Sequence, residues 1–329
     1  MIGSFLGPPS GGGTPILCSL LRFYTPVRSP TVRMSGVTPW FRLLRPVNGF
    51  ISLIGTVVGG ISATGIYGAP IPSELAALLL AGTATFLVTG GGNVLNDYLD
   101  VEGDRVNHPE RPLPRGEISR EAARRFALLL FLLSTLPIVL ISPVTPTPFH
   151  LALVPFLLTL VVWVSSALLL VAYEYRGKAM GLPGNALVAY LTGAVFLFGG
   201  SVVGNPWTTL PWLLMAFFAT LSREIVKDME DAGGDDGRAT LPREHGMATA
   251  ALAARVSVVC AIGLSIFPLV TWLPPVSVAG IAYLGAVLVS DVTFVLSIRW
   301  LPERLHREQG LSKLAMVFAL VAFVGSSLR

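Results

Sequence analysis

The sequence contains little charge and almost no cysteine. Only 13% of its 329 residues are charged and 53% are hydrophobic, whereas soluble domains carry about 25% charged residues. The two cysteines, Cys18 and Cys260, form neither a disulfide framework nor a metal motif. No basic stripe interleaved with aromatic residues is present, so nucleic acid is not expected as a partner. This composition excludes an ordinary water-soluble domain and favours a membrane protein.

The apolar residues are collected in blocks of roughly twenty, the length that crosses about 30 Å of hydrocarbon. Prolines 137, 155 and 268 fall inside blocks, where neighbouring helices can satisfy the freed backbone groups. We therefore predict an all-α bundle of nine transmembrane helices, with no obligatory protein partner inferred. The blocks cover residues 48–67, 74–99, 120–142, 149–173, 184–203, 207–229, 247–271, 276–299 and 313–328.

Basic residues are concentrated on one side of the predicted membrane. They gather in the N-terminal segment and around the links after the second, fourth, sixth and eighth blocks, and one further arginine ends the chain. The intervening links near Gly68, Pro146, Asn205 and Pro274 contain none. The positive-inside rule then predicts a multi-pass cell-membrane protein with its N-terminus in the cytoplasm and its C-terminus outside.

The N-terminal segment differs from the rest of the chain. Residues 1–39 are predicted to be a disordered leader or a mis-assigned start, with Met34 as a possible initiator, and residues 40–329 form the transmembrane domain. Within that domain, Trp40–Pro46 is typical of a short interfacial helix. Its Arg42 and Arg45 are expected to face lipid headgroups.

Acidic residues are concentrated in two short windows. Ten of the 19 Asp and Glu residues lie in residues 97–104 and 224–236. Both windows contain the spacing D-x-x-D-x-x-x-D, which on a helix covers an arc of about 60°. Glycines just before the last acid of each window indicate that the helix frays there. The aspartates are Asp97, Asp100 and Asp104 in the first window, and Asp228, Asp231 and Asp235 in the second.

Such clusters require compensating charge. Two carboxylates about 4 Å apart repel by roughly 4 kcal/mol at an effective dielectric near 20. Mg²⁺ typically takes one or two carboxylates plus substrate phosphates, and neighbouring Arg and Lys side chains pair well with phosphate oxygens. A single charged window at a helix end is commonly just a solvated cap. Two copies of one spacing, on the same predicted membrane face, favour a metal-bound polyphosphate instead.

The same residues resemble the UbiA-type intramembrane prenyltransferases. The family's first motif, N-D-x-x-D-x-x-x-D followed by R-P-x-x-x-G, is matched by Asn96–Asp104 and Arg111–Gly116. Its second motif is matched by Asp228, Asp231 and Asp235. The resemblance covers about residues 40–329. Residues 44–48, 223–228 and 234–242 are similar to the archaeal subgroup that forms digeranylgeranylglyceryl phosphate.

This resemblance implies an enzyme, its substrates and its site. It implies transfer of a geranylgeranyl group from geranylgeranyl diphosphate to geranylgeranylglyceryl phosphate, with Mg²⁺ as cofactor and the six aspartates as catalytic metal ligands. The isoprenoid chain would lie in a central cavity open to the cytoplasmic side and to membrane lipid. The residues expected to bind substrate are Asn96, Arg105, Arg111, Tyr173, Lys178, Arg223 and Lys227.

Two other functions are compatible with parts of the pattern. Within the enzymes, the acceptor is instead an aromatic acid, a quinone precursor or a haem, because the diphosphate site would be shared. In a different class, the chain is an ion-coupled transporter or divalent-cation channel. Transporters place their sites near the membrane midplane, whereas these acids lie at helix ends. Asp291, alone inside the eighth block, is expected to be protonated or paired within the bundle.

Overall fold

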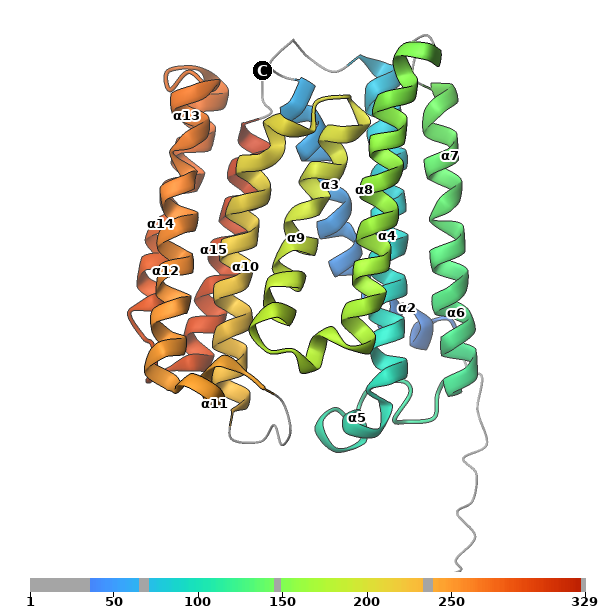
Figure 1. Ribbon diagram of the computed structural model, residues 1–329, viewed down its shortest axis with the longest axis vertical. Helices are drawn as coiled ribbons and strands as arrows, with labels where there is room; N and C mark the ends of the chain where they lie inside the picture. Colours follow the sequence, from blue (N-terminus) through green and yellow to red (C-terminus); the bar gives the residue numbers. More distant parts are fainter. Residues whose placement is uncertain (1–35, 65–70, 145–148, 233–238, 327–329) are drawn as a thin grey trace, which may run out of the picture.

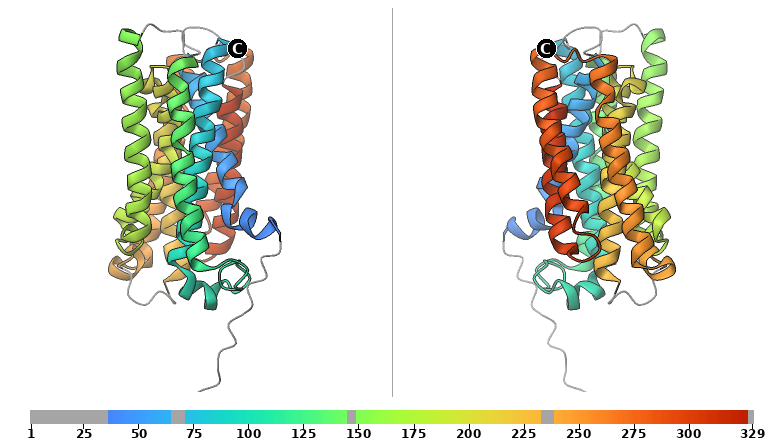
Figure 2. Two further views of the ribbon diagram at one scale, coloured as in Figure 1. Left: turned by 90° about the vertical axis from the view of Figure 1, so that its right-hand side faces the viewer. Right: turned by 90° about the vertical axis from the view of Figure 1, so that its left-hand side faces the viewer.

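The computed structural model describes residues 36–64, 71–144, 149–232 and 239–326, and side chains of residues 142–155 are not described. The described chain is a bundle of helices that run along one common axis (Figures 1 and 2). The elements are α2 (Thr38–Leu44), α3 (Pro46–Thr64), α4 (Pro72–Leu99), α5 (Val101–Asn107), α6 (Arg120–Leu133), α7 (Thr135–Val144), α8 (Phe149–Tyr175), η2 (Gly177–Ala179), α9 (Leu182–Val202), η3 (Pro206–Thr209), α10 (Leu210–Asp231), α11 (Leu241–His245), α12 (Met247–Ser265), α13 (Phe267–Thr271), α14 (Val278–Ile298) and α15 (Leu305–Gly325).

Nine helical segments of the described chain are long and apolar enough to cross a membrane. The predicted all-α class and the predicted number of spans are confirmed. Two spans are interrupted beside a proline: α6 gives way to α7 just before Pro137, and α12 gives way to α13 just before Pro268. Proline lacks the N–H for the helical hydrogen bond, so a break at these positions is expected.

The predicted start of the last span is wrong. The apolar block begins at residue 313, but α15 already begins at Leu305. Its first turns are polar and include Glu308, which is fully buried and accepts a hydrogen bond from Ser312. A hydropathy pattern misses such a turn, because polar side chains buried inside the bundle leave no apolar signal in the sequence.

Helices α3 and α9 approach one another closely because small residues line their contact. A Cβ added at Gly199 would lie 1.9 Å from the Thr56 carbonyl oxygen, and one added at Gly59 would lie 2.5 Å from the Phe196 carbonyl oxygen. Glycine therefore permits backbone contact between these helices, as is common in membranes. Helices α10, α12, α14 and α15 form a second group, and Trp212, Tyr283 and Phe323 pack together in its core.

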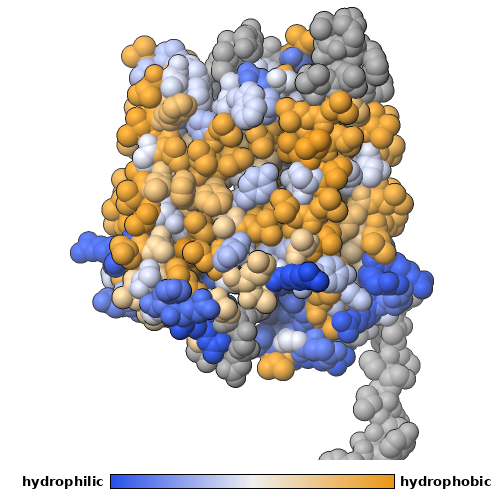
Figure 3. Space-filling view, in the orientation of Figure 1, coloured by the Kyte–Doolittle hydropathy of each residue, from blue (hydrophilic) through white to orange (hydrophobic). Residues whose placement is uncertain are grey.

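Hydrophobic side chains cover the middle of the bundle surface. Figure 3 shows this apolar band, with hydrophilic residues gathered at the end where α5 and α11 lie. Both acidic windows belong to that end: α4 passes into α5 there, and α10 ends beside α11 (Figure 1). The two motifs therefore lie at the same end of the bundle.

Candidate active site

The first motif is built where α4 meets α5. Asp97 belongs to the last turns of α4, Asp100 is the break between the helices, and Asp104 lies in α5. The prediction that the helix frays before Asp104 is wrong, because helical structure resumes at Val101 and continues to Asn107. Asp97 and Asp104 are almost fully buried, with 2% and 5% exposure, so both carboxylates need partners.

One guanidinium joins these two aspartates. Arg111 Nη1 lies 2.7 and 2.6 Å from the two carboxylate oxygens of Asp104 and 3.4 Å from Oδ1 of Asp97. A single positively charged atom is therefore shared by three carboxylate oxygens. The R-P-x-x-x-G segment that follows the first motif supplies this cation, which explains why the two stretches belong together.

Asp100 faces a different set of partners. Lys178 Nζ, from η2, lies 2.8 Å from Asp100 and 2.6 Å from Glu174. Glu174 also accepts a hydrogen bond of 3.1 Å from the Asn96 side chain. Asn96, Asp100 and Lys178 are thus brought together as the sequence predicts. The buried Glu174 connects them and was not selected from the sequence.

The second motif is linked to the first by the segment between α8 and α9. Asn185, at the start of α9, donates a hydrogen bond of 2.6 Å to Asp228, while Lys178 lies seven residues earlier in the same segment. The turn is tight. A Cβ at Gly184 would lie 2.1 Å from the Gly177 carbonyl oxygen. Gly181 has φ of +60°, which favours glycine. One short connection therefore contacts both motifs.

The expected orientation of the two N-terminal arginines is wrong. Arg45 forms an ion pair with Asp97, and Arg42 lies 3.3 Å from Glu117, so both turn toward the protein rather than toward headgroups. Arg45 has φ of +51°, an uncommon conformation for a residue with a side chain. The buried carboxylate of Asp97 supplies the compensating interaction. The short helix predicted over Trp40–Pro46 is present as α2, but it spans Thr38–Leu44 and ends before Arg45.

Some of the remaining predicted site residues lie at the site and others do not. Arg105 is exposed and pairs with Glu102, so the structure does not bring it to the cluster. Arg223 contacts Glu224 at 3.1 Å, and Lys227 lies 3.8 Å from the same carboxylate. The following three residues complete the set: Asp231 is the last residue of α10, Tyr173 lines the cavity described next, and Asp235 lies outside the described residues.

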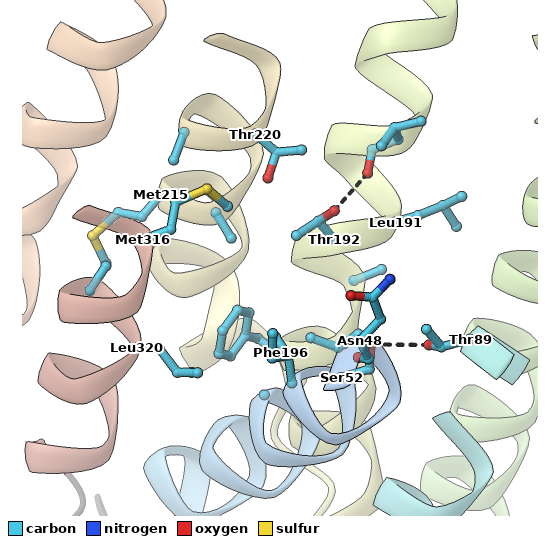
Figure 4. A pocket seen from close by; sticks show the side chains of 18 of the residues that line it. Asn48, Ser52, Thr89, Leu191, Thr192, Phe196, Met215, Thr220, Met316 and Leu320 are labelled. Carbon is cyan, nitrogen blue, oxygen red and sulfur yellow. Dashed lines mark hydrogen bonds between the residues drawn. The ribbon is translucent and has the colours of Figure 1, made fainter. Parts of the chain in front are cut away.

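The site opens into a cavity of about 740 Å³ in the centre of the bundle. Figure 4 shows its wall, with Phe196, Met316 and Leu320 beside polar residues such as Asn48. Cavities of about 300–1,000 Å³ lined mainly by apolar groups are typical of small-molecule sites. The predicted central cavity is confirmed.

The cavity is bounded on one side by α3 and α15, which hardly touch one another. Ile51 of α3 and Val317 of α15 line it and are 50% and 55% exposed. At its other end the cavity reaches Tyr173 and Glu174, beside the first motif. An apolar chain in this cavity would therefore have its polar end near the acidic motifs.

The first motif has the oxygen donors that a divalent cation requires. Among the described residues, no three His, Cys, Asp or Glu side chains form a metal-binding group. The Asp97 and Asp104 oxygens nevertheless converge on one cationic atom of Arg111. Mg²⁺ commonly uses only one or two carboxylates and completes its shell with phosphate and water. The donor set fits such an ion.

These features define a class of protein: a polytopic membrane enzyme with a charged site at the mouth of an apolar cavity. A sequence model of the UbiA prenyltransferase family matches residues 52–319. The chain belongs to this family. Membership decides against the transporter or channel interpretation, since the family is one of prenyl-transferring enzymes.

The similar proteins share one described activity. The digeranylgeranylglyceryl phosphate synthase of Methanothermobacter thermautotrophicus is 41% identical over 213 residues, 64% of this chain and 68% of that protein. The protein of the same name from Methanococcus aeolicus is 35% identical and covers 88% of this chain and 97% of its own length.

Solved structures share the fold. A structure of digeranylgeranylglyceryl phosphate synthase has a TM-score of 0.67 and 28% identity, and covers 89% of this chain and 98% of its own. A UbiA homologue from Archaeoglobus fulgidus bound to GPP and Mg²⁺ has a TM-score of 0.58 and 17% identity, covering 88% and 100%.

Proposed function

We propose that the chain is a Mg²⁺-dependent prenyltransferase that joins geranylgeranyl diphosphate to geranylgeranylglyceryl phosphate. The observation that carries the proposal is that both aspartate motifs lie at one end of the bundle, joined through the segment from Lys178 to Asn185, at the mouth of an apolar cavity. The names of the similar archaeal proteins support the substrate pair. In this reaction the carbon–oxygen bond to diphosphate breaks and an ether bond to the free glycerol hydroxyl forms.

The six aspartates are proposed to hold the metal, as the sequence analysis predicts. Bound Mg²⁺ would act as a Lewis acid on the diphosphate leaving group. Arg111 and Lys178 now occupy carboxylates of the first motif. With these carboxylates holding a metal, Arg111 and Lys178 would be available to the diphosphate oxygens, and Lys227 at the edge of the second motif would add a third cation. Arg and Lys form strong charge-assisted hydrogen bonds with phosphate groups.

Other residues position the donor and receive the proton. Glu174 holds Lys178 and Asn96 at the motif, and Tyr173 lines the cavity close by. The ring face of Tyr173 would stabilise positive charge that develops on the allylic carbon. The hydroxyl proton of the acceptor leaves to water at the open cytoplasmic end after attack. Glu230 is not needed as a base and is engaged by Gln309.

The side of the membrane is also part of the proposal. The basic links and both motifs lie at the same end of the bundle, and the positive-inside rule places that end in the cytoplasm. Labelling of single cysteines in the loops by an impermeant thiol reagent tests this orientation. Reaction from outside at residue 108 would contradict it, as would lack of reaction from outside at residue 275.

The decisive test of the reaction is product mass. Purified protein is incubated with geranylgeranyl diphosphate, Mg²⁺ and a panel of acceptors that includes geranylgeranylglyceryl phosphate, 4-hydroxybenzoate, a naphthoate and haem. We expect a product only with the glycerol-based acceptor, and none when Mg²⁺ is chelated. Preferred transfer to an aromatic acceptor or haem would overturn the substrate assignment while leaving prenyl transfer intact.

A further inference from the structure

The central cavity contains two cationic side chains that lie outside the first acidic motif. Arg223 lines it from α10 and Lys313 lines it from α15. Lys313 is eight residues into its helix, about 12 Å along the axis from Leu305. A lysine within a membrane-spanning helix is costly and commonly marks a functional site. These two residues therefore require an explanation of their own.

Neither cation is neutralised as those of the first motif are. Arg111 and Lys178 are each bound by two carboxylates. The Lys313 side chain, by contrast, has no hydrogen bond or ion pair with any residue that the structure describes. Arg223 contacts Glu224 through Nη1, but its Nε is buried without a hydrogen-bond partner. Lys313 is exposed, whereas the Arg223 Nε is buried, and a buried donor without a partner is the kind of group that a bound anion or water satisfies.

A hydroxyl group adds to this set of donors. Thr220, one helical turn from Arg223, is 2% exposed and its hydroxyl has no hydrogen-bond partner. Figure 4 shows it on the cavity wall, with Met215 on the same helix and Met316 on α15. The acid that shares the cavity, Asp291, accepts a hydrogen bond of 2.8 Å from Ser265 and forms no ion pair with Lys313.

An apolar path continues from Lys313 along the same helix face. Met316, Val317 and Leu320 follow it at positions i+3, i+4 and i+7 and line the cavity. These spacings put all four side chains on one face of α15. A ligand with an anionic head and a long hydrocarbon chain would match this stripe. Ile51 of α3 and Val317 of α15 line the cavity and are about half exposed, so such a lipid would reach the cavity from the membrane between them.

We propose that Lys313 and Arg223 bind the phosphate monoester of the acceptor lipid, separately from the diphosphate of the donor. This assignment rests on the proposed function, and it places Arg223, one of the residues expected to bind substrate, at the acceptor. The donor diphosphate remains with the two aspartate motifs, Arg111 and Lys178. Lys313 and Arg223 would therefore select a phosphorylated acceptor over the corresponding neutral alcohol.

The test compares Lys313→Gln with wild type on two acceptors, geranylgeranylglyceryl phosphate and geranylgeranylglycerol. A charge-assisted hydrogen bond lost from the complex should raise KM for the phosphorylated acceptor on the order of tenfold or more. The KM for geranylgeranyl diphosphate should stay unchanged, and the neutral acceptor should not distinguish the two proteins. Lys313→Arg should restore most of the affinity. Arg223→Gln should behave like Lys313→Gln.

A matched control is available on the same helix. Arg307 lies over the ring of Trp300 and is not part of the cavity wall. Arg307→Gln removes the same charge from α15 and should leave both acceptor KM values unchanged. An equal rise in KM for both acceptors in Lys313→Gln would show a structural role and overturn the proposal. A rise in donor KM alone would assign Lys313 to the diphosphate.

A binding measurement separates failure of this proposal from failure of the proposed function. Calorimetry with chelator present and no donor should show that wild type binds geranylgeranylglyceryl phosphate more tightly than geranylgeranylglycerol, and that Lys313→Gln does not discriminate. If wild type discriminates but makes no product, the reaction is wrong and the phosphate site stands. If wild type makes product but both proteins bind the two acceptors equally, only the phosphate site is wrong.

Discussion

Replacement of Arg111 by methionine is the sharpest test of the charge balance at the first motif. Asp104 has a side-chain exposure of 7% and contacts Arg111 through both oxygens. Asp97 retains its ion pair with Arg45. Removing one partner of a buried ion pair costs about 3–5 kcal/mol. We expect the free energy of unfolding of Arg111→Met to fall by about 3 kcal/mol, the lower end of that range. Only one of the two carboxylates loses its cation.

Bound Mg²⁺ should reverse this loss of stability. An ion that binds only the folded state adds about 2.7 kcal/mol when present at a hundredfold its Kd. Mg²⁺ should therefore restore most of the stability of Arg111→Met. It should stabilise the variant more than wild type, in which Arg111 competes for the same carboxylates.

The assay is thermal unfolding of purified protein in detergent, followed by tryptophan fluorescence with and without Mg²⁺. Arg105→Met serves as the control. Arg105 pairs only with the exposed Glu102, and such a surface pair contributes about 0–1 kcal/mol. The reasoning fails if Arg111→Met unfolds at the wild-type temperature in chelator. It also fails if the midpoint falls but Mg²⁺ raises it no more than in wild type.

Three further outcomes are expected. Asp100→Ala and Asp231→Ala should each abolish turnover with Mg²⁺ present while the protein elutes as folded in detergent; retained turnover would remove that residue from the metal site. Gly184→Ala should lower activity at least on the order of tenfold because its Cβ would clash with the Gly177 carbonyl oxygen; wild-type turnover would contradict this. Deletion of residues 1–33 should leave activity unchanged, which a turnover assay of the truncated protein checks.

The two aspartate motifs are readable from sequence because their spacing is local. Asp97, Asp100 and Asp104 follow a helical repeat, so they are predicted to share a face without knowledge of the rest of the fold. Their cations are harder to predict. Arg45 and Lys178 lie 52 and 78 residues from the aspartates they contact. No local rule connects residues so far apart, so the sequence wrongly predicts that Arg45 faces lipid headgroups.

The same limit applies to Asn185 and Glu174. Each is an ordinary polar residue near the end of an apolar run, and neither has a spacing that distinguishes it from a helix cap. Only the packing of α8 and α9 beside α4 and α10 brings Asn185 to Asp228 and Glu174 to Asn96. The glycines between them gave no functional signal, although the tight turn depends on them.

Hydropathy and charge in the sequence alone determined the class, the number of spans and the two acidic motifs. These are properties of segments, because a helix in lipid must satisfy its backbone internally and present an apolar surface. The tertiary structure decided which cation neutralises which aspartate, and that Lys313 and Arg223 share a cavity. Those are relations between helices, and they depend on how closely side chains allow the helices to pack.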